Sequence, residues 1–316
     1  MVGEAHARSS VPLLTLALLA LALPWLLSTL GMDYYISLAG RIVVFAIAAT
    51  SLNLVLGYGG LISFGHAAFF GLGAYVTGIL ISEGVMSAAV HVFAALAITG
   101  VTALAIGAIA LRTRGVYFIM ITLAFAQMVF YIANSIKGYG GDEGLNLRAR
   151  SVLAFGLDLK NSTVFYYVAL SVLVLVLLAL ARFVPSRMGR AVVAMRDDVD
   201  RAEALGFATR RLQLLLFTVA GMLGGVAGWL HANQQGYVSP GLLHWTQSGT
   251  LMVMCILGGV GRLWGGVLGA VALLLLQEVV ALYTTHWEFF VGIVLLAAVL
   301  FARQGLAALF NRWARP

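Results

Sequence analysis

Two very long stretches without a charged residue constrain this chain more than any other feature. Leu212–Gly261 runs for 50 residues, and Ile42–Ser82 runs for 41 residues, without Asp, Glu, Lys or Arg. Over the whole sequence 62% of the residues are apolar and only 10% are charged, whereas about 25% are charged in an ordinary soluble domain. This composition excludes a soluble globular enzyme and a disordered chain, and it indicates a protein embedded in a membrane.

The apolar stretches predict about ten transmembrane helices, because one span needs roughly 20 mostly apolar residues. Ile42–Ser82 is long enough for two spans with a break at residues 57–60, and Leu212–Gly261 is long enough for two around a polar, turn-rich middle. The other predicted spans are Pro12–Leu30, Gly84–Leu111, Gly115–Ile136, Asn161–Ala181, Gly265–Tyr283 and Glu288–Phe301. We therefore expect an all-α, polytopic membrane bundle that forms one transmembrane domain over residues 1–316.

A cleaved signal peptide is the alternative interpretation of Pro12–Leu30. The apolar run is longer than the apolar region of a typical signal peptide, and no A-x-A cleavage site follows it. The sequence therefore favours a membrane span there.

The basic residues predict which side of the membrane each connection faces. With the N-terminus in the cytoplasm, fourteen of the 19 Lys and Arg residues fall in cytoplasmic segments, and four fall outside, namely Lys137, Arg148, Arg150 and Lys160. This positive-inside bias, with an even number of spans, predicts cytoplasmic N- and C-termini. It also accounts for most of the net charge of +7, so we expect no nucleic-acid binding.

The longest predicted cytoplasmic connection, residues 185–211, has the pattern of a folded element. Acidic and basic residues alternate within it, and Gly206 is suited to close a helix at its C-terminal end. The alternative is a solvated loop that only preserves the topology. We expect a docking surface for a cytoplasmic partner here, and we expect the outer loop, residues 137–162, to face an extracytoplasmic one.

The segment Leu52–Tyr75 combines glycines with polar residues inside an apolar stretch. Asn53, Ser63 and His66 lie within it, and three of the four residues at 57–60 are glycine. Irregular backbone at membrane depth is tolerated only where protein buries it or where it lines a watery cavity. The pattern predicts either a broken helix that offers polar groups to a solute or a cytoplasmic turn beside a buried histidine. A weakly similar pattern at Leu257–Gly266 suggests an internal repeat.

Motifs for catalysis and for energy conversion are absent from the sequence. It contains no G-x-x-x-x-G-K-[ST], no H-E-x-x-H and no Cys/His set with metal-ligand spacing. No chain of Asp, Glu and His crosses the predicted spans, which disfavours a proton-coupled carrier. We therefore expect no catalytic residue, no metal and no cofactor in this chain, and we expect it to take its energy from a partner subunit.

Four stretches of the sequence carry a resemblance to a known family. They are SLNLVLGYGGLISFGHAAFFGLGAY at Ser51–Tyr75, RGVYFIMITLAFAQM at Arg114–Met128, the segment Gly189–Pro240, and LGGVGRLWGGVLGA at Leu257–Ala270. Together they resemble the LivM-like permeases of the LivH/LivM family, which belong to ABC importers of branched-chain amino acids. The outer segment GYGGDEGLNL at Gly138–Leu147 is similar to the acidic, glycine-rich segment of the family but departs from it in detail, which leaves the substrate open.

The resemblance implies a multi-pass permease subunit in the bacterial inner (cytoplasmic) membrane, which forms half of a pathway that works by alternating access. It implies a second, LivH-like permease, two cytoplasmic ABC ATPases that bind ATP and Mg, a periplasmic substrate-binding protein, and membrane lipid. The implied substrates are branched-chain amino acids or related small amino or carboxylic acids. The alternatives are a permease for urea, short amides or aromatic acids, and a stand-alone secondary carrier.

The resemblance also implies roles for individual residues. The coupling helix that would dock on an ATPase comprises Arg196, Asp197, Asp198, Arg201, Glu203, Ala204, Leu205 and Gly206. The candidates for the translocation pathway or its packing are Asn53, Ser63, His66 and Phe69, with Tyr117, Thr122 and Gln127 as weaker ones.

Overall fold

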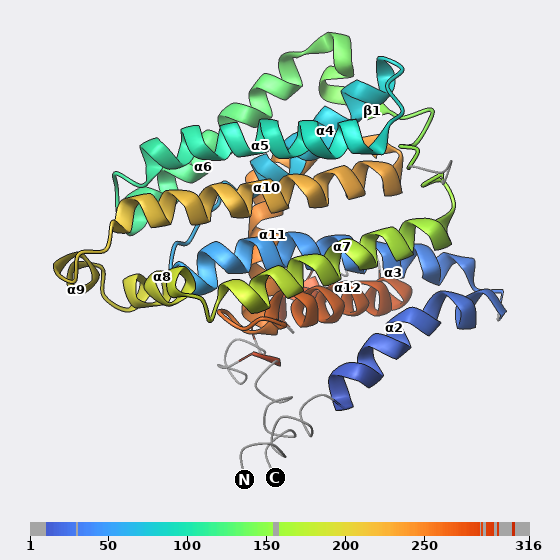
Figure 1. Cartoon of the computed structure of the whole chain (residues 1–316). Helices are drawn as coiled ribbons and strands as arrows, with labels where there is room; N and C mark the ends of the chain where they lie inside the picture. The colour runs from blue at the N-terminus through green and yellow to red at the C-terminus, as the bar shows by residue number, and fades with distance from the viewer. Residues whose placement is uncertain are drawn as a thin grey trace.

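The chain folds into a bundle of long helices that lie side by side, as Figure 1 shows for a computed structural model. The structure describes residues 11–29, 31–153, 158–284, 286, 289–293, 296 and 305–306. Six of the described helical segments are long and apolar enough to cross a membrane. They are α3 (Asp33–Asn53) with the π-helical turn η1 (Leu54–Tyr58), α5 (Ala88–Ala110), α6 (Val116–Ser135), α7 (Ser162–Phe183), α10 (Thr209–Gln235) and α12 (Gly265–Tyr283). The protein is therefore all-α in its membrane part and multi-pass.

Three other helices coincide with predicted spans, namely α2 (Val11–Thr29), α4 (His66–Ser82) and α11 (Trp245–Gly258). The predicted span Glu288–Phe301 falls mostly outside the described residues, so the total of ten spans and the sidedness of the termini stay predictions. One predicted boundary is wrong, because α3 begins at Asp33 and not at Ile42. The helix accommodates Arg41 in its interior, where the guanidinium carbon lies 5.8 Å from the centre of the Phe45 ring.

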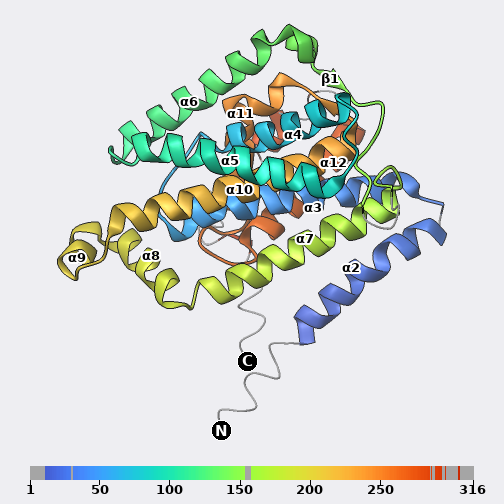
Figure 2. The ribbon, with the colours of Figure 1, turned by 45° about the horizontal axis from the view of Figure 1, so that its top comes forward.

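The connections gather at the two ends of the bundle. At one end, the loop end, η2 (Lys137–Tyr139) and η3 (Gly141–Glu143) precede β1 (Leu145–Asn146), which pairs antiparallel with β2 (Tyr237–Val238) ahead of η5 (Pro240–Leu243). At the other end, the basic end, α8 (Arg187–Asp197) and α9 (Val199–Ala204) connect α7 to α10. Figure 2 shows α9 projecting there beyond the ends of α5 and α7. The four basic residues predicted to lie outside all belong to the loop end, which agrees with the predicted alternation of the connections.

The centre of the bundle is formed by α10 against α4 and α5 on one side and α3 on the other (Figures 1 and 2). Glycine makes this contact close. A Cβ atom at Gly228 would lie 1.9 Å from the Phe70 carbonyl oxygen, and one at Gly73 would lie 2.0 Å from the Gly225 carbonyl oxygen. Such backbone-to-backbone packing is how helices associate in lipid, where apolar side chains alone provide little driving force.

We predict that Gly228→Ala lowers the stability of the bundle, because the methyl group would force α4 and α10 apart. Overpacking of this kind costs about 1–3 kcal/mol, and it should lower the unfolding temperature of the purified protein in detergent. Gly249→Ala in α11 is the matched control, since its methyl group would meet a neighbouring atom only at 3.9 Å. Equal unfolding temperatures for the two variants would contradict the packing argument.

Candidate functional site

Two glycine-rich breaks interrupt the membrane helices and meet each other at the basic end. The first break, residues 59–65, lies between η1 and α4, and the second, residues 259–264, lies between α11 and α12. Gly57 and Gly261 are in backbone contact, because a Cβ atom at Gly57 would lie 2.3 Å from the Gly261 nitrogen. We call this contact, with the two breaks around it, the glycine junction. It brings together the two segments whose sequences resemble each other, although their origin as a repeat is untested.

Asn53 holds the glycine junction from the end of α3. Its Oδ1 accepts a hydrogen bond from the Gly261 nitrogen at 2.9 Å, and its Nδ2 donates to the Arg262 carbonyl oxygen at 2.8 Å. The side chain is buried, so both of its polar atoms are used to satisfy peptide groups that leave helical pairing. Asn53 therefore clamps the end of α3 to the second break.

The candidates His66, Phe69 and Ser63 are all buried in the core near the start of α4. His66 Nε2 lies 2.7 Å from the Ser51 hydroxyl, and its ring packs edge-on against Phe69. His66 Nδ1 is buried and has no hydrogen-bond partner in the described part of the chain. The Ser63 hydroxyl accepts from the Gly65 nitrogen at 3.1 Å. These side chains support the break and the first turn of α4.

The three weaker candidates on α6 lie apart from one another. Thr122 is buried, and its hydroxyl accepts from the Phe64 nitrogen at 3.3 Å, which links α6 to the first break. Gln127 Nε2 lies 3.4 Å from His244 Nε2. Tyr117 is 76% exposed on the outside of the bundle. The structure therefore brings Thr122 to the first break and leaves Tyr117 away from it.

Ser248 is a supporting residue that the sequence did not single out. From α11, its hydroxyl accepts from the Ala67 nitrogen at 2.7 Å and donates to the Phe64 carbonyl oxygen at 2.7 Å. It is fully buried. A serine inside an apolar helix could have marked this position in the sequence. Its hydrogen-bond partners, Phe64 and Ala67, lie far from it in the chain, so the sequence alone did not reveal its role.

The connection at the basic end contains two helices where the resemblance implied a single coupling helix. Asp198 is extended, with φ of −160°, and its side chain accepts a hydrogen bond from the Arg201 nitrogen at 3.0 Å. It thereby caps α9 and separates it from α8. Gly206 has φ of +85°, and the Phe207 nitrogen donates to the Ala202 carbonyl oxygen, so Gly206 closes α9 as the sequence predicted. We call residues 187–206 the coupling segment.

The outer part of the coupling segment carries exposed apolar and charged side chains. Leu205 is 71% exposed, and Phe207, directly after the segment, is 41% exposed. Arg114, from the turn between α5 and α6, lies 3.3 Å from Asp200 and 3.8 Å from Glu203. All three charged side chains are at least half exposed, so these ion pairs add little to stability. Asp197, Arg201 and Ala204 complete the predicted set, and of these Arg201 pairs with Asp198 at 3.6 Å.

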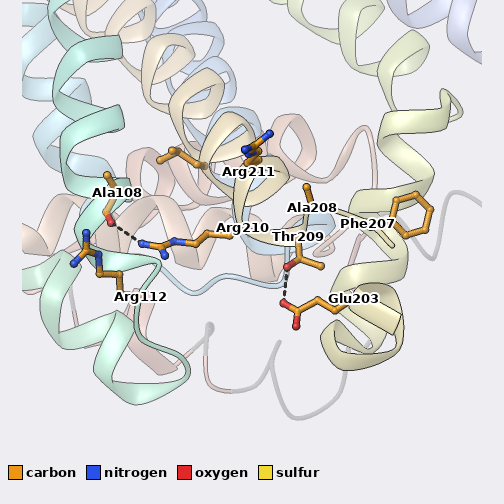
Figure 3. Close-up of a pocket in the computed structure, with 9 residues that line it drawn as sticks. Ala108, Arg112, Glu203, Phe207, Ala208, Thr209, Arg210 and Arg211 are labelled. Atoms are coloured by element: carbon orange, nitrogen blue, oxygen red, sulfur yellow. Dashed lines mark hydrogen bonds between the residues drawn. The ribbon is translucent and has the colours of Figure 1, made fainter. Parts of the chain in front are cut away.

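An open pocket of about 570 Å³ lies between α9, the start of α10 and the end of α5. Figure 3 shows Glu203 accepting a hydrogen bond from the Thr209 hydroxyl, at 2.7 Å, and Arg210 reaching the Ala108 carbonyl oxygen, at 3.4 Å. Arg112 also lines this pocket. The concave surface beside α9 is therefore rich in arginine.

Arg196 lies differently from the rest of the coupling segment, because its side chain turns toward the membrane bundle. Its Nη1 donates to the Gly57 carbonyl oxygen at 3.0 Å, while Nε and Nη2 donate to Asp197 at 3.2 and 3.0 Å. The resemblance groups Arg196 with the docking residues, and in the structure its side chain lies against the glycine junction.

The predicted outer loop packs on the loop end of the bundle. The Tyr139 hydroxyl donates to Glu83 at 3.0 Å, and this hydrogen bond raises the pKa of Tyr139. Arg150 donates to the Leu147 carbonyl oxygen at 3.0 Å, and desolvation lowers the pKa of its guanidinium. Residues 154–157 of this loop lie outside the described residues.

Known proteins are similar to this chain over almost its whole length. The permease protein LivM of the high-affinity branched-chain amino acid transport system of Escherichia coli is 28% identical over 96% of this chain and 76% of its own length. LivM of Salmonella typhimurium is 27% identical with the same coverage, and LivH of Escherichia coli is 25% identical over 81% of this chain and 88% of its own. No solved structure matches the chain. The family described as branched-chain amino acid transport system / permease component matches residues 34–299, and the chain belongs to this family.

Proposed function

We propose that the chain is the permease subunit of an ATP-driven ABC importer and forms half of its translocation pathway by alternating access. The observation that carries the proposal is the family match over residues 34–299, which takes in every helix from α3 to α12. The subunit is non-catalytic in this proposal, and ATP and Mg bind to the partner ATPases. It resides in the bacterial inner membrane, with its basic end in the cytoplasm.

The proposed substrates are branched-chain amino acids or related small amino or carboxylic acids. The relatives that match this chain over most of its length are permeases of branched-chain amino acid transport systems by name. The autoinducer 2 import permease LsrC of Klebsiella pneumoniae is 36% identical, but over only 43% of this chain. The longer matches favour a branched-chain amino acid as the substrate over autoinducer 2, and a periplasmic binding protein would select it.

The coupling segment supports the proposed assembly. Its helix α9 projects from the basic end (Figure 1). Near α9, Leu205 and Phe207 expose apolar surface beside charged side chains. Apolar side chains with a polar rim are typical of a protein–protein interface. We propose that two ABC ATPases dock at the basic ends of this chain and of a second, LivH-like permease, and that the loop ends receive the binding protein.

We predict that transport requires the ATPases. The purified chain should hydrolyse no ATP, because neither a phosphate-binding loop nor its lysine is present. Proteoliposomes should accumulate leucine only when both permeases, the ATPases and the binding protein are present. Leucine accumulation driven by a Na⁺ gradient in proteoliposomes that hold this chain alone would contradict the proposal and identify a secondary carrier.

We predict that Gly206→Glu and Glu203→Lys weaken ATPase docking while the bundle stays folded. Both changes alter the charge of the projecting α9, and a like-charge contact or a lost charged partner at an interface costs about 2–5 kcal/mol, or roughly thirtyfold or more in affinity. The measurement is co-purification of the ATPases with the two permeases in detergent.

Gly84→Glu is the matched control for this experiment. Gly84 and Gly206 have φ of +84° and +85°, and a Cβ atom at either would meet nothing within 4 Å. Both substitutions therefore impose a similar backbone strain of about 1–2 kcal/mol, but Gly84 lies at the loop end. ATPases that co-purify normally with both the Gly206→Glu and the Glu203→Lys variants would contradict the docking assignment.

A further inference from the structure

Among the described residues of the coupling segment, only Arg196 has a side chain that hydrogen-bonds to the region of a helix break. Its partner, Gly57, lies in η1, directly before the first break. Besides the bond to Gly57, its stem lies against the first break, because a Cβ atom at Gly60 would be 2.6 Å from Arg196 Cγ. Its Nη1 lies 3.4 Å from the place where a Cβ atom of Gly261 would be. The guanidinium thus bonds to η1 and lies beside the second break.

The base of this contact is firmly held. Val192 and Met195, on the same face of α8, are almost fully buried. The Asp197 carboxylate, on the same helix, accepts two hydrogen bonds from the Arg196 guanidinium and so orients it. A displacement of α8 therefore moves the guanidinium with it.

From Gly57 the contact continues into the second break through backbone atoms and the buried Asn53 side chain. Gly57 touches Gly261, and Asn53 is bonded to the Gly261 nitrogen and the Arg262 carbonyl oxygen. Beyond them, a Cβ atom at Gly258 would lie 1.8 Å from the Gly265 carbonyl oxygen, so the backbones of α11 and α12 are also in direct contact with each other. Close-packed contacts of this kind transmit a shift where a loose contact would absorb it.

We infer that Arg196 is a positioning residue that transmits movement of the coupling segment to both helix breaks, and that this is its role in place of ATPase docking. The inference rests on the proposed function, since it takes the ATPases to dock on the coupling segment. It assigns the docking surface to α9 and its flanks, and it assigns the internal link to the last turn of α8.

The test compares Arg196→Gln, Arg196→Lys and Arg190→Gln in the complete transporter, reconstituted with both permeases, the ATPases and the binding protein. Arg190 is exposed on the same helix and is the matched control. With Arg196→Gln we expect the ATPases to co-purify and ATP hydrolysis to continue, while leucine taken up per ATP hydrolysed falls about tenfold, as for loss of one charged hydrogen bond. Arg196→Lys should restore part of the uptake, and Arg190→Gln should match the unaltered chain.

Two results would overturn the inference. One is an uptake per ATP with Arg196→Gln equal to that with Arg190→Gln. The other is loss of the ATPases from the purified Arg196→Gln complex, which would make Arg196 a docking contact. Failure of the proposed function is seen separately, in the unaltered complex, as uptake that needs no ATPase.

A second measurement follows the first break directly. Cys255, the single cysteine, is buried, and Ile62 in the first break is 43% exposed, so Ile62→Cys provides one accessible thiol. Its rate of labelling by a maleimide should change when ATP is added to the complex. Arg196→Gln should abolish that change in labelling rate. Arg196→Lys, which keeps the charge and the aliphatic stem, should reduce it. If the Arg196→Gln variant does not insert into the membrane, the Arg196→Lys variant provides the test. Either of two labelling results would overturn the inference. One is a labelling rate of Ile62→Cys that ATP does not change when Arg196 is present. The other is an ATP-dependent change in that rate that stays the same with Arg196→Gln and with Arg196→Lys.

Discussion

The structure depends on satisfying backbone polar groups where membrane helices break. In a bilayer, a peptide group that leaves helical pairing must find its partner within the protein. The two breaks achieve this with side chains of neighbouring elements, and Asn53, at the end of α3, supplies both a donor and an acceptor to the second one. Thr122 and Ser248 do the same for the first break from α6 and α11. The reversals from α3 to α4 and from α11 to α12 are therefore one coupled feature.

Glycine allows the two breaks to approach, because the contact of Gly57 with Gly261 joins backbone to backbone. The same chemistry recurs between α4 and α10, where Gly73 and Gly228 face peptide groups of the opposite helix. Helices in lipid gain stability from close packing, since lipid tails are as apolar as leucine. A single added methyl group would therefore destabilise a bundle that is packed in this way. The same close packing holds the polar groups at the breaks in fixed positions.

The sequence predicted the existence of the membrane helices better than their ends. Charge-free length identified nine spans that coincide with described helices, but it placed the start of α3 too late because Arg41 was treated as a boundary. Arg41 is tolerated over the Phe45 ring, and such a contact leaves no trace in a local charge pattern. Likewise, alternating charges indicated a folded coupling segment, whereas its division depends on the backbone of Asp198.

The candidate site shows the same limit at a longer range. Asn53 was conspicuous as a polar residue in an apolar stretch, yet its role as a clamp depends on partners more than two hundred residues away in the chain. A single sequence shows which residue is unusual, and the contacts that define its function come from the tertiary fold.

The division of the coupling segment at Asp198 separates two physical tasks. On α8, the buried Val192 and Met195 and the inward Arg196 bind the segment to the bundle. On α9, the flanking Leu205 remains exposed, and the ion pairs with Arg114 are solvated and weak. In the proposed assembly, the coupling segment receives a partner and moves its own bundle, and these two tasks need one free surface and one packed surface. One continuous helix would carry both surfaces on a single rigid body, whereas the break that Asp198 caps separates the exposed α9 from α8 and its contact with the glycine junction.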